Sequence, residues 1–180
     1  GYANGYFVVP TIIYGITEGK LVDLGLQNAY SLQVPILVDI DLARGRSGMV
    51  GEGKNIWPIL MIFDYRALIS DLFVALCDAI IVNPDKVGHG CEGMYFGENS
   101  ENTLYEVSKA IGQALGDAGK CEDAEPAALT EGEIDNISGY GNEYMGSESR
   151  YRGNRSRLIG WRPIHTTTIS AAPTCKPISF

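Results

Sequence analysis

Residues 149–163 read SRYRGNRSRLIGWRP and give the strongest local signal for the fold. Gly160 can end a helix, Trp161 is a large apolar anchor, and Pro163 prevents the helix from continuing. We therefore expect a short basic helix on the surface, held at its end by the indole. A solvated helix with a packed tryptophan and a binding site both fit this pattern. The stretch reverses the acidic charge of the chain through five arginines: Arg150, Arg152, Arg155, Arg157 and Arg162.

The chain has 180 residues and a formal net charge of -8. This length suits a single domain over residues 1–180 and is enough to bury a hydrophobic core. The acidic balance argues against a general nucleic-acid surface. The arginine cluster can still hold one phosphate or carboxylate, because a guanidinium group binds these anions through two hydrogen bonds. We expect a small-molecule substrate as partner and no nucleic acid.

The sequence gives no sign of a membrane or metal protein. No apolar run approaches the roughly 20 residues that span a bilayer, and no basic start leads into an apolar core. The four cysteines are widely spaced, form no Cys-x-x-Cys pair, and have only two histidines to join them. We expect a cytoplasmic protein with reduced thiols, no membrane partner and no metal.

Two segments carry strand-like composition. Residues 6–14 are rich in β-branched and aromatic side chains, and Pro10 predicts an end or kink within them. Residues 94–96 predict a second, short strand. Residues 31–44 combine a proline with an apolar run and fit either a short strand or a buried helical turn. Residues 45–55 contain four glycines and predict a loop.

Helical spacing of apolar residues marks two further segments. Residues 64–82 predict a helix with Asp64 as its N-cap, and residues 103–115 predict the clearest helix, capped by Thr103 or the residue before it. Residues 120–148 are rich in Glu, Gly and Ser and predict a surface excursion.

One motif has the spacing of a dinucleotide-binding turn. Residues 88–93 read GHGCEG and match G-x-G-x-x-G. In such a turn a helix must follow, so that its N-terminus meets the pyrophosphate. Strand-like residues follow here, so a loop before a strand is the favoured interpretation.

A second motif places a tyrosine four residues before a lysine. Tyr105 and Lys109 match Tyr-x-x-x-Lys, the catalytic pair of short-chain dehydrogenases, in which the lysine lowers the pKa of the tyrosine so that it acts as a general base. This pair lies on a late helix rather than on the central helix of those enzymes. A pair on the helix surface is therefore the favoured interpretation.

Three blocks of the chain, in order, resemble one family. Residues 1–15 read GYANGYFVVPTIIYG, residues 93–115 read GMYFGENSENTLYEVSKAIGQAL, and residues 149–163 end in LIGWRP. They resemble the C-terminal half of extended short-chain dehydrogenases, the NAD(P)-dependent epimerase/dehydratase family, including fungal NAD(P)-binding and NmrA/epimerase-like proteins. The resemblance implies an α/β fold: a partial Rossmann-like sheet with the smaller, substrate-binding portion.

The resemblance also implies what the chain contributes to function. The family places its phosphate loop and its catalytic pair before the block that resembles residues 1–15, so we expect the substrate-side half of an oxidoreductase or epimerase. NAD or NADP is the cofactor that the resemblance implies. We expect no catalytic residue in this chain, which makes catalysis by these residues alone improbable.

The family likeness points to candidate contacts with ligands. Tyr14 and Gly15 match a Tyr-Gly signature on the floor of the active site, where Tyr14 would lie beside both substrate and cofactor. Lys54 and Asn55 lie in a loop that borders the substrate in the relatives. The remaining candidates for a substrate phosphate are Arg152 and Arg155. A strand-end turn, solvated loop residues and a solvated helix are the plain alternatives at these positions.

One block departs from the family pattern. The relatives carry N-V-H-V-D-D where this chain has Ile-Leu-Met-Ile-Phe-Asp, so Met61 replaces the histidine and Phe63 one of the acids. Only Asp64 remains, and a role as helix cap explains it. This departure weakens the expectation of an intact site.

Three hypotheses follow from these observations. The chain is the rear portion of an NAD(P)-dependent enzyme, or a non-catalytic binding or interaction module derived from that family, or an incompletely recorded sequence. An exposed strand edge within residues 6–14 would favour self-association or a missing N-terminal half as partner. All three require the two predicted strands to be neighbours, with Val8 close to Tyr95.

Overall fold

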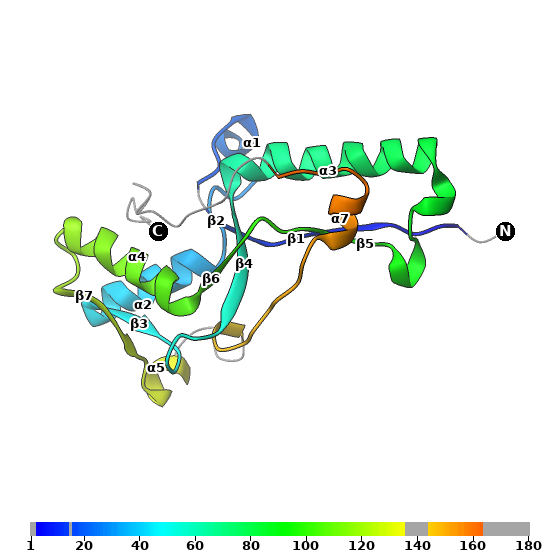
Figure 1. Cartoon of the computed structure of the whole chain (residues 1–180). Coiled ribbons are helices and arrows are strands. Elements are labelled where there is room, and N and C mark those ends of the chain that lie inside the picture. The colour runs from blue at the N-terminus through cyan, green and yellow to red at the C-terminus, as the bar shows by residue number, and fades with distance from the viewer. Residues whose placement is uncertain (1–2, 15, 136–143, 164–180) are drawn as a thin grey trace. The chain divides into compact units, whose positions relative to one another are not determined.

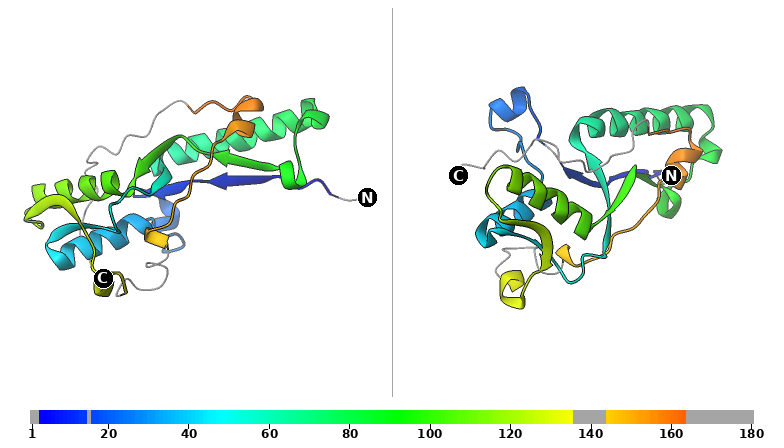
Figure 2. Two further views of the ribbon diagram at one scale, coloured as in Figure 1. Left: turned by 60° about the horizontal axis from the view of Figure 1, so that its bottom comes forward. Right: turned by 60° about the vertical axis from the view of Figure 1, so that its left-hand side comes forward.

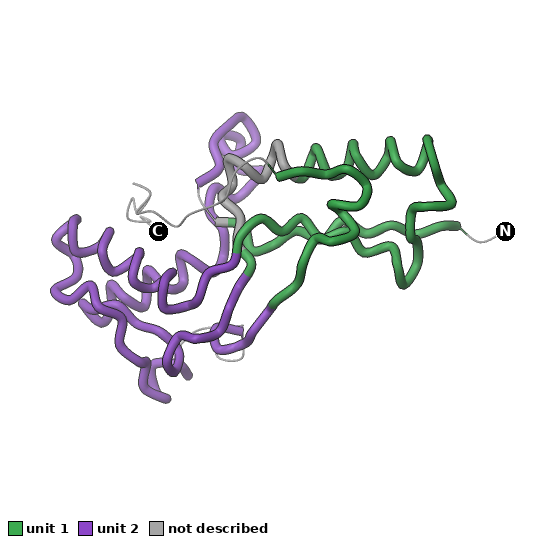
Figure 3. The backbone as a smooth tube through the Cα atoms, in the orientation of Figure 1, with its two compact units in different colours: residues 1–13, 58–100, 150–167 green, residues 14–57, 101–149, 168–180 purple. Residues whose placement is uncertain are grey.

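The computed structural model describes residues 3–14, 16–135 and 144–163, and it divides into two compact units (Figure 3). Unit 1 consists of Gly1–Ile13, Pro58–Ser100 and Arg150–Thr167. Unit 2 consists of Tyr14–Trp57, Glu101–Ser149 and Thr168–Phe180. Each unit therefore combines segments that are far apart in the sequence. The single domain expected from the chain length stays a prediction.

Unit 1 is built on two parallel strands, β1 (Phe7–Pro10) and β5 (Met94–Gly97). In their register Val8 lies opposite Tyr95. The prediction that the two segments form neighbouring strands is confirmed. Pro10 ends β1, as its missing N–H requires.

A long helix, α3 (Ile62–Val82), runs along this pair of strands (Figure 1). It begins directly after β4 (Ile56–Met61), with no intervening cap residue. Asp64 therefore lies inside the first turn, so the prediction that it is the N-cap is wrong.

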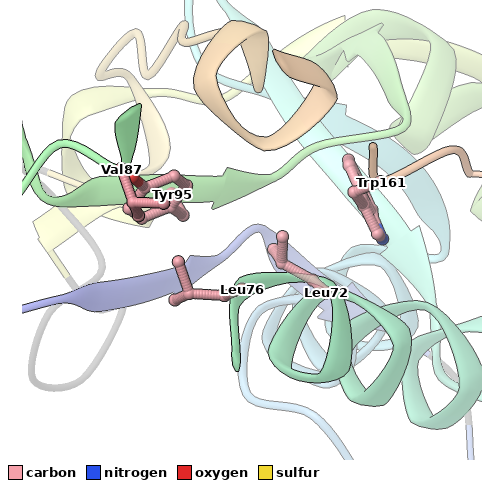
Figure 4. Packing of buried hydrophobic residues seen from close by; sticks show 5 residues of the cluster. All are labelled: Leu72, Leu76, Val87, Tyr95 and Trp161. Atoms are coloured by element: carbon pink, nitrogen blue, oxygen red, sulfur yellow. The ribbon is translucent and has the colours of Figure 1, made fainter. Parts of the chain in front are cut away.

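The core of unit 1 is an apolar cluster contributed by four elements of the chain (Figure 4). Leu72 and Leu76 are four residues apart on α3, so they present one face of the helix to the cluster. Each fully buried large side chain contributes about 1.5–3 kcal/mol of transfer free energy. The cluster comprises Leu72, Leu76, Val87, Tyr95 and Trp161.

Three short helices complete unit 1. The turns η1 (Pro84–Lys86) and η2 (Gly90–Glu92) connect α3 to β5, and α7 (Asn154–Leu158) packs on β5. The strand after η2 is β5, so the G-x-G-x-x-G sequence opens a strand rather than a helix. The motif thus precedes a strand, as interpreted, but its residues Gly90–Glu92 form the short helix η2 rather than a loop.

Three further strands have the order β2–β4–β6, where β2 is Ile12–Tyr14 and β6 is Ser100–Thr103. The chain passes from one unit to the other within each of these strands.

Unit 2 contains a second parallel pair, β3 (Arg46–Met49) and β7 (Asp123–Ala128). The helices α2 (Gln33–Arg44) and α4 (Leu104–Asp117) pack against these strands (Figure 2). The register of the pair shifts between Arg46 and Gly48. Pro126 of β7 falls at this shift, where a residue without an N–H is tolerated.

Two smaller helices and one bridge also belong to unit 2. They are α1 (Lys20–Asp23), α5 (Glu131–Asp135) and an antiparallel bridge between Ile16 and Tyr30.

The helix α4 shows how sequence determines packing in unit 2. The Thr103 hydroxyl accepts the Glu106 N–H at 3.2 Å, and the Glu106 carboxylate accepts the Thr103 N–H at 2.7 Å, which is a complete capping box. The predicted cap at Thr103 is confirmed. Gly112 allows the helix to approach β7, because a Cβ at this position would lie 2.6 Å from the Ala124 carbonyl oxygen.

Two local predictions differ from the structure, and one open alternative is decided. Residues 31–44 fitted a short strand or a buried helical turn, and the structure has a helix there, α2, in which Pro35 occupies the first turn and loses no hydrogen bond. Residues 45–55 contain the strand β3 rather than only a loop. Residues 120–148 are not only a surface excursion, because β7 pairs with β3 and buries part of this segment in unit 2.

Candidate functional site

The carboxyl ends of β1 and β5 meet at one edge of unit 1, because the strands are parallel and Pro10 lies opposite Gly97. In open α/β sheets ligands bind outside the carboxyl ends of the strands. Glu98 follows β5 directly, and residues 151–157 reach this edge from the far end of the chain. This edge is the best candidate for a functional site in unit 1.

The arginine-rich stretch folds as predicted. The helix α7 is short, Gly160 has a φ of +95°, and Trp161 is only 2% exposed. The Ser156 hydroxyl donates to the Phe96 carbonyl at 2.8 Å, which fixes α7 to β5. The backbone at residue 153 comes so close to β5 that only glycine fits, since a Cβ there would lie 2.6 Å from the same carbonyl oxygen.

Glu98 places a negatively charged side chain at this edge. Its carboxylate accepts the Gly153 N–H at 3.0 Å and pairs with the Arg157 guanidinium at 2.9 Å. The same guanidinium donates to the Glu98 carbonyl at 3.3 Å and lies over the Trp161 ring. The Glu98 side chain is only 12% exposed, so the pair is largely shielded from water. Arg157 therefore neutralises a buried carboxylate and positions α7.

Tyr151 contacts the last residues of both strands at this edge. Its hydroxyl donates to the Pro10 carbonyl at 3.0 Å, and its ring stacks on Phe96 with 4.5 Å between centroids. Burial, with a smaller contribution from the negative charge of Glu98, raises the pKa of Tyr151 to about 12. The phenol is therefore protonated at neutral pH and acts as a hydrogen-bond donor.

The two predicted arginine contacts lie at different places: Arg152 follows Tyr151 at this edge, whereas Arg155 approaches Glu92, which precedes β5 at its amino end. Arg152 is exposed and makes no hydrogen bond or ion pair with the described part of the chain. Arg155 is also exposed, and its nearest acid is Glu92 at 4.0 Å. Either guanidinium can meet an anionic group from solvent, so a role in substrate binding stays a prediction.

The predicted loop contacts lie in unit 2 and differ from each other. Lys54 is highly exposed and pairs with Glu52 at 2.5 Å, and this hydrogen bond raises the pKa of Lys54. The Asn55 side-chain amide donates to the carbonyls of Met145 and Ser147, each at 3.1 Å. Asn55 thus ties two segments of unit 2 together, and its predicted contact with substrate is untested.

The two remaining predicted ligand contacts, Tyr14 and Gly15, are only partly described by the structure. Tyr14 ends β2, and its side chain lies outside the described structure, as does the whole of Gly15. Their predicted contacts with substrate and cofactor stay predictions.

The Tyr105–Lys109 pair is a hydrogen-bonded pair on the surface of unit 2. The Lys109 ammonium donates to the Tyr105 hydroxyl at 3.1 Å, and that hydroxyl donates to Glu125 at 2.6 Å. Lys109 also lies 3.3 Å from Glu125, and both of these side chains are exposed. The three groups tie α4 to β7 across the surface, as the sequence favoured.

Sequence reasoning missed the network around Glu98 and Tyr151. The available signal for Glu98 was an acid two residues after the predicted strand over residues 94–96. Its partner Arg157 is 59 residues away, so no local pattern could reveal the pair.

The described part of the chain has neither a metal-binding cluster nor a helix suited to span a membrane. Residues 3–14, 16–135 and 144–163 hold no group of three or more acidic, histidine or cysteine side chains placed to bind a metal ion. Within the same ranges, no helix is both long and apolar enough to cross a membrane.

Comparisons with known proteins place the fold. No family model matches the chain. It is 29% identical over 136 residues to the oxidase ucsJ of Acremonium sp, covering 71% of this chain and 38% of that protein. It superposes on PbgP3 of Burkholderia pseudomallei with a TM-score of 0.50 and 14% identity, covering 95% of this chain and 45% of that one.

A human epimerase family protein, SDR39U1 with NADPH, matches with a TM-score of 0.46 and 19% identity, over 92% of this chain and 45% of that one. The chain thus spans less than half of the length of each relative. It has an α/β fold with parallel strands, and this fold matches about half of the PbgP3 structure.

Proposed function

We propose that this chain is the substrate-side portion of an NAD(P)-dependent oxidoreductase or epimerase, and that it binds substrate without completing a reaction by itself. The observation that supports this most is the similarity over 136 residues to an oxidase, of which this chain covers 38%. The match to PbgP3 includes 95% of this chain but only 45% of that one, which supports a partial fold and adds nothing about activity.

The edge formed by Pro10, Glu98 and Tyr151 suits binding more than chemistry. The Glu98 carboxylate is engaged by Arg157 and the Gly153 N–H, and the Tyr151 phenol keeps its proton at neutral pH. Neither group is free to accept a proton from a substrate. Arg152, by contrast, is exposed and unengaged among the described residues, so it can pair with a substrate phosphate or carboxylate.

The Tyr105–Lys109 pair does not supply the missing base. Its hydroxyl donates to Glu125, and the pair lies on the surface of α4. General-base chemistry needs a group positioned against a bound substrate, in a site from which water is excluded. Cofactor binding and hydride transfer are therefore assigned to residues other than those described.

A non-catalytic binding module is the second candidate. It is favoured by Met61 and Phe63, which replace polar residues of the family pattern. The resemblance to the epimerase/dehydratase family implies a nucleotide sugar as substrate. A non-catalytic module would retain the fold and lose the response to such a ligand.

The experiment titrates the isotopically labelled 180-residue chain with UDP-glucose and with NADPH. Amide chemical shifts monitor ligand binding, and the absorbance of the nicotinamide monitors oxidation of NADPH. We expect UDP-glucose to shift resonances around Arg152 and the absorbance of NADPH to stay constant. The variant Arg152→Ala should lose the shifts. Arg162→Ala is the matched control, because Arg162 donates to the carbonyls of Arg157 and Trp161.

The outcomes separate the two candidates. Absence of any shift with UDP-glucose would favour the non-catalytic module. Oxidation of NADPH by this chain would contradict the proposal that the described residues do not complete the reaction.

A further inference from the structure

Three fully buried polar side chains come from three elements of unit 2. They are Asp41 of α2, Ser47 of β3 and Ser108 of α4, each 0% exposed. The two helices pack against β3 and against each other. Buried polar groups are normally hydrogen-bonded, so the partners of these side chains decide how the three elements are held together.

The Ser47 hydroxyl has a single hydrogen and two acceptors within reach. In the structure it donates to the Ser108 carbonyl at 2.8 Å, and this bond connects β3 to α4. The second acceptor is the Asp41 carboxyl, because a hydrogen bond from Ser47 favours the ionised form of this acid. A hydroxyl donates only one hydrogen bond, so Ser47 serves one of the two acceptors at a time.

The Asp41 carboxyl is only half satisfied in the structure. Its Oδ1 accepts the Gly48 N–H at 2.8 Å, whereas Oδ2 has no hydrogen-bond partner among the described residues. A carboxylate can only accept hydrogen bonds, so an ionised Oδ2 left without a donor is costly in the interior. A protonated Oδ2 can instead donate to the Ser47 oxygen, which keeps its lone pairs while its hydrogen is directed to Ser108.

Arg44 is the positive charge that acts on Asp41, and it is shared with other groups. Its guanidinium pairs with Glu133 at 2.7 Å and donates to the Ala127 carbonyl at 3.4 Å. Burial therefore prevails over Arg44 and over the hydrogen bonds from Gly48 and Ser47, and it raises the pKa of Asp41 to about 6.

The other charged side chains of the elements around α2 have partners of their own or face solvent. Arg46 of β3 pairs with Asp123 of β7, Lys109 of α4 pairs with Glu125 of β7, Glu106 bonds to the N-cap of α4, and Asp117 is exposed at the end of α4. The proton on Asp41 is thus governed by burial, by Arg44 and by the direction of the Ser47 hydroxyl.

We propose that the Ser47 hydroxyl is a two-position switch set by the proton on Asp41. When Asp41 holds the proton, its Oδ2–H donates to Ser47 and Ser47 donates to the Ser108 carbonyl, so one chain of hydrogen bonds connects α2, β3 and α4. When the proton leaves to solvent, the carboxylate needs a donor and the Ser47 hydroxyl turns to it. The hydrogen bond between β3 and α4 is then lost.

The contact at which this bond acts is tight. One turn after Ser108, a Cβ at Gly112 would lie only 2.8 Å from Ser47 Cβ, so α4 and β3 are in direct contact there. The Ser108 carbonyl keeps its bond within the helix in both positions, which makes the second position accessible. This inference concerns the interior of unit 2 and does not rest on the proposed function.

The test is carbon-detected NMR of the isotopically labelled 180-residue chain between about pH 5 and 8, the range around the pKa of Asp41. The carboxyl carbon of Asp41 reports the proton, and the carbonyl carbon of Ser108 reports the hydrogen bond from Ser47. We expect both signals to titrate with one midpoint. The Phe96 carbonyl, which accepts the Ser156 hydroxyl at 2.8 Å in unit 1, should not follow that midpoint.

Two variants separate the two positions of the switch. In Ser47→Ala the Asp41 carboxyl should still titrate, but the Ser108 carbonyl should lose its titration because the hydroxyl that turns is gone. In Asp41→Asn the side-chain amide can donate at every pH, so the Ser108 carbonyl should keep its low-pH chemical shift throughout. Ser156→Ala is the matched control, since it removes a buried hydroxyl from unit 1 and should leave both titrations unchanged.

Three results would overturn the proposal. They are a Ser108 carbonyl that does not follow Asp41 in the unmodified chain, a titration of that carbonyl that persists in Ser47→Ala, and an Asp41 carboxyl that is already fully ionised at the acidic end of the range. If Ser47→Ala does not fold, the unmodified chain and Asp41→Asn decide between the two outcomes.

Discussion

The two units bury different kinds of side chains in their interiors. Unit 1 buries an apolar cluster together with the hydroxyls of Thr11 and Ser156, and its Asn99 Nδ2 is buried without a hydrogen-bond partner among the described residues. Unit 2 buries Asp41, Ser47 and Ser108 among its apolar residues. Of these, Asp41 Oδ2 and the Ser108 hydroxyl have no hydrogen-bond partner among the described residues. The units thus differ most in their shielded acids: the Glu98 carboxylate of unit 1 pairs with Arg157, whereas the fully buried Asp41 of unit 2 leaves its Oδ2 without a partner among the described residues.

Each unit also contains one tryptophan. Trp161 lies in the core of unit 1, and Trp57 is buried in unit 2 with its indole N–H donating to the Ser147 carbonyl at 2.8 Å. A Trp57→Phe background reports unit 1 by fluorescence, and a Trp161→Phe background reports unit 2. The comparison can therefore be tested unit by unit.

The largest expected effect is that of Leu72→Ala in unit 1. Leu72 is fully buried in the apolar cluster, so its truncation removes buried surface and leaves a cavity that costs about 2–5 kcal/mol of unfolding free energy. Urea unfolding should show an earlier Trp161 transition and an unchanged Trp57 transition. Phe73→Ala, at an exposed position on the same helix, should change neither transition substantially.

Equal shifts of both transitions after Leu72→Ala would mean that the units unfold together. That result would support the single domain expected from the chain length and would remove the energetic contrast between the units.

The second effect concerns the buried acid of unit 2. Burial raises the pKa of Asp41 to about 6, against the opposing hydrogen bond from the Gly48 N–H at 2.8 Å and the charge of Arg44. The folded state then binds this proton more tightly than the unfolded state. The stability of unit 2 should therefore fall as the pH rises from about 4 through 6, by up to about 3 kcal/mol.

Asp41→Asn should flatten this dependence of the Trp57 transition on pH and leave the Trp161 transition as it was. The control is Asp39→Asn, which removes an exposed carboxylate from the same helix. A pH slope that persists in the Asp41 variant would assign the effect to another group.

A third effect probes how closely α4 approaches β3 and β7. In Gly112→Ala the new methyl would lie 2.6 Å from the Ala124 carbonyl oxygen and 2.8 Å from Ser47 Cβ, so we expect a loss of about 1–3 kcal/mol in unit 2. Gly116→Ala, on the same helix, meets nothing nearer than 3.9 Å and should gain up to about 1 kcal/mol from helix propensity. A neutral Gly112→Ala would mean that the helix can move away at little cost.

These contrasts also explain what the sequence could predict. Local signals were sufficient for β1, which ends at Pro10, and for α4, which begins with the Thr103–Glu106 capping box. The resemblance of ordered blocks was sufficient to pair Val8 with Tyr95. Each of these features depends on residues close in sequence or on a pattern shared with a family.

Features that depend on distant partners were missed. The strand β7 has the sequence DAEPAA, which carries little β-propensity, and its pairing with β3 brings together residues about 80 apart. Asp41 stands between two apolar residues on α2, and nothing local distinguishes it from a solvated acid. The Glu98–Arg157 pair is hidden in the same way, so the candidate site required the structure.

The smallest effect should come from Lys109→Met, which tests whether unit 2 carries chemistry. Hydrogen bonds with Tyr105 and Glu125 raise the pKa of Lys109, so the ammonium is charged at neutral pH, but its exposure leaves the interaction screened by water. We expect no measurable change in either fluorescence transition and no loss of the chemical shifts induced by UDP-glucose. Lys120→Met, at another exposed position just after α4, is the control for loss of charge. If Lys109→Met alone abolished the response to UDP-glucose, ligand binding would belong to the surface of α4 in unit 2 rather than to the arginines of unit 1.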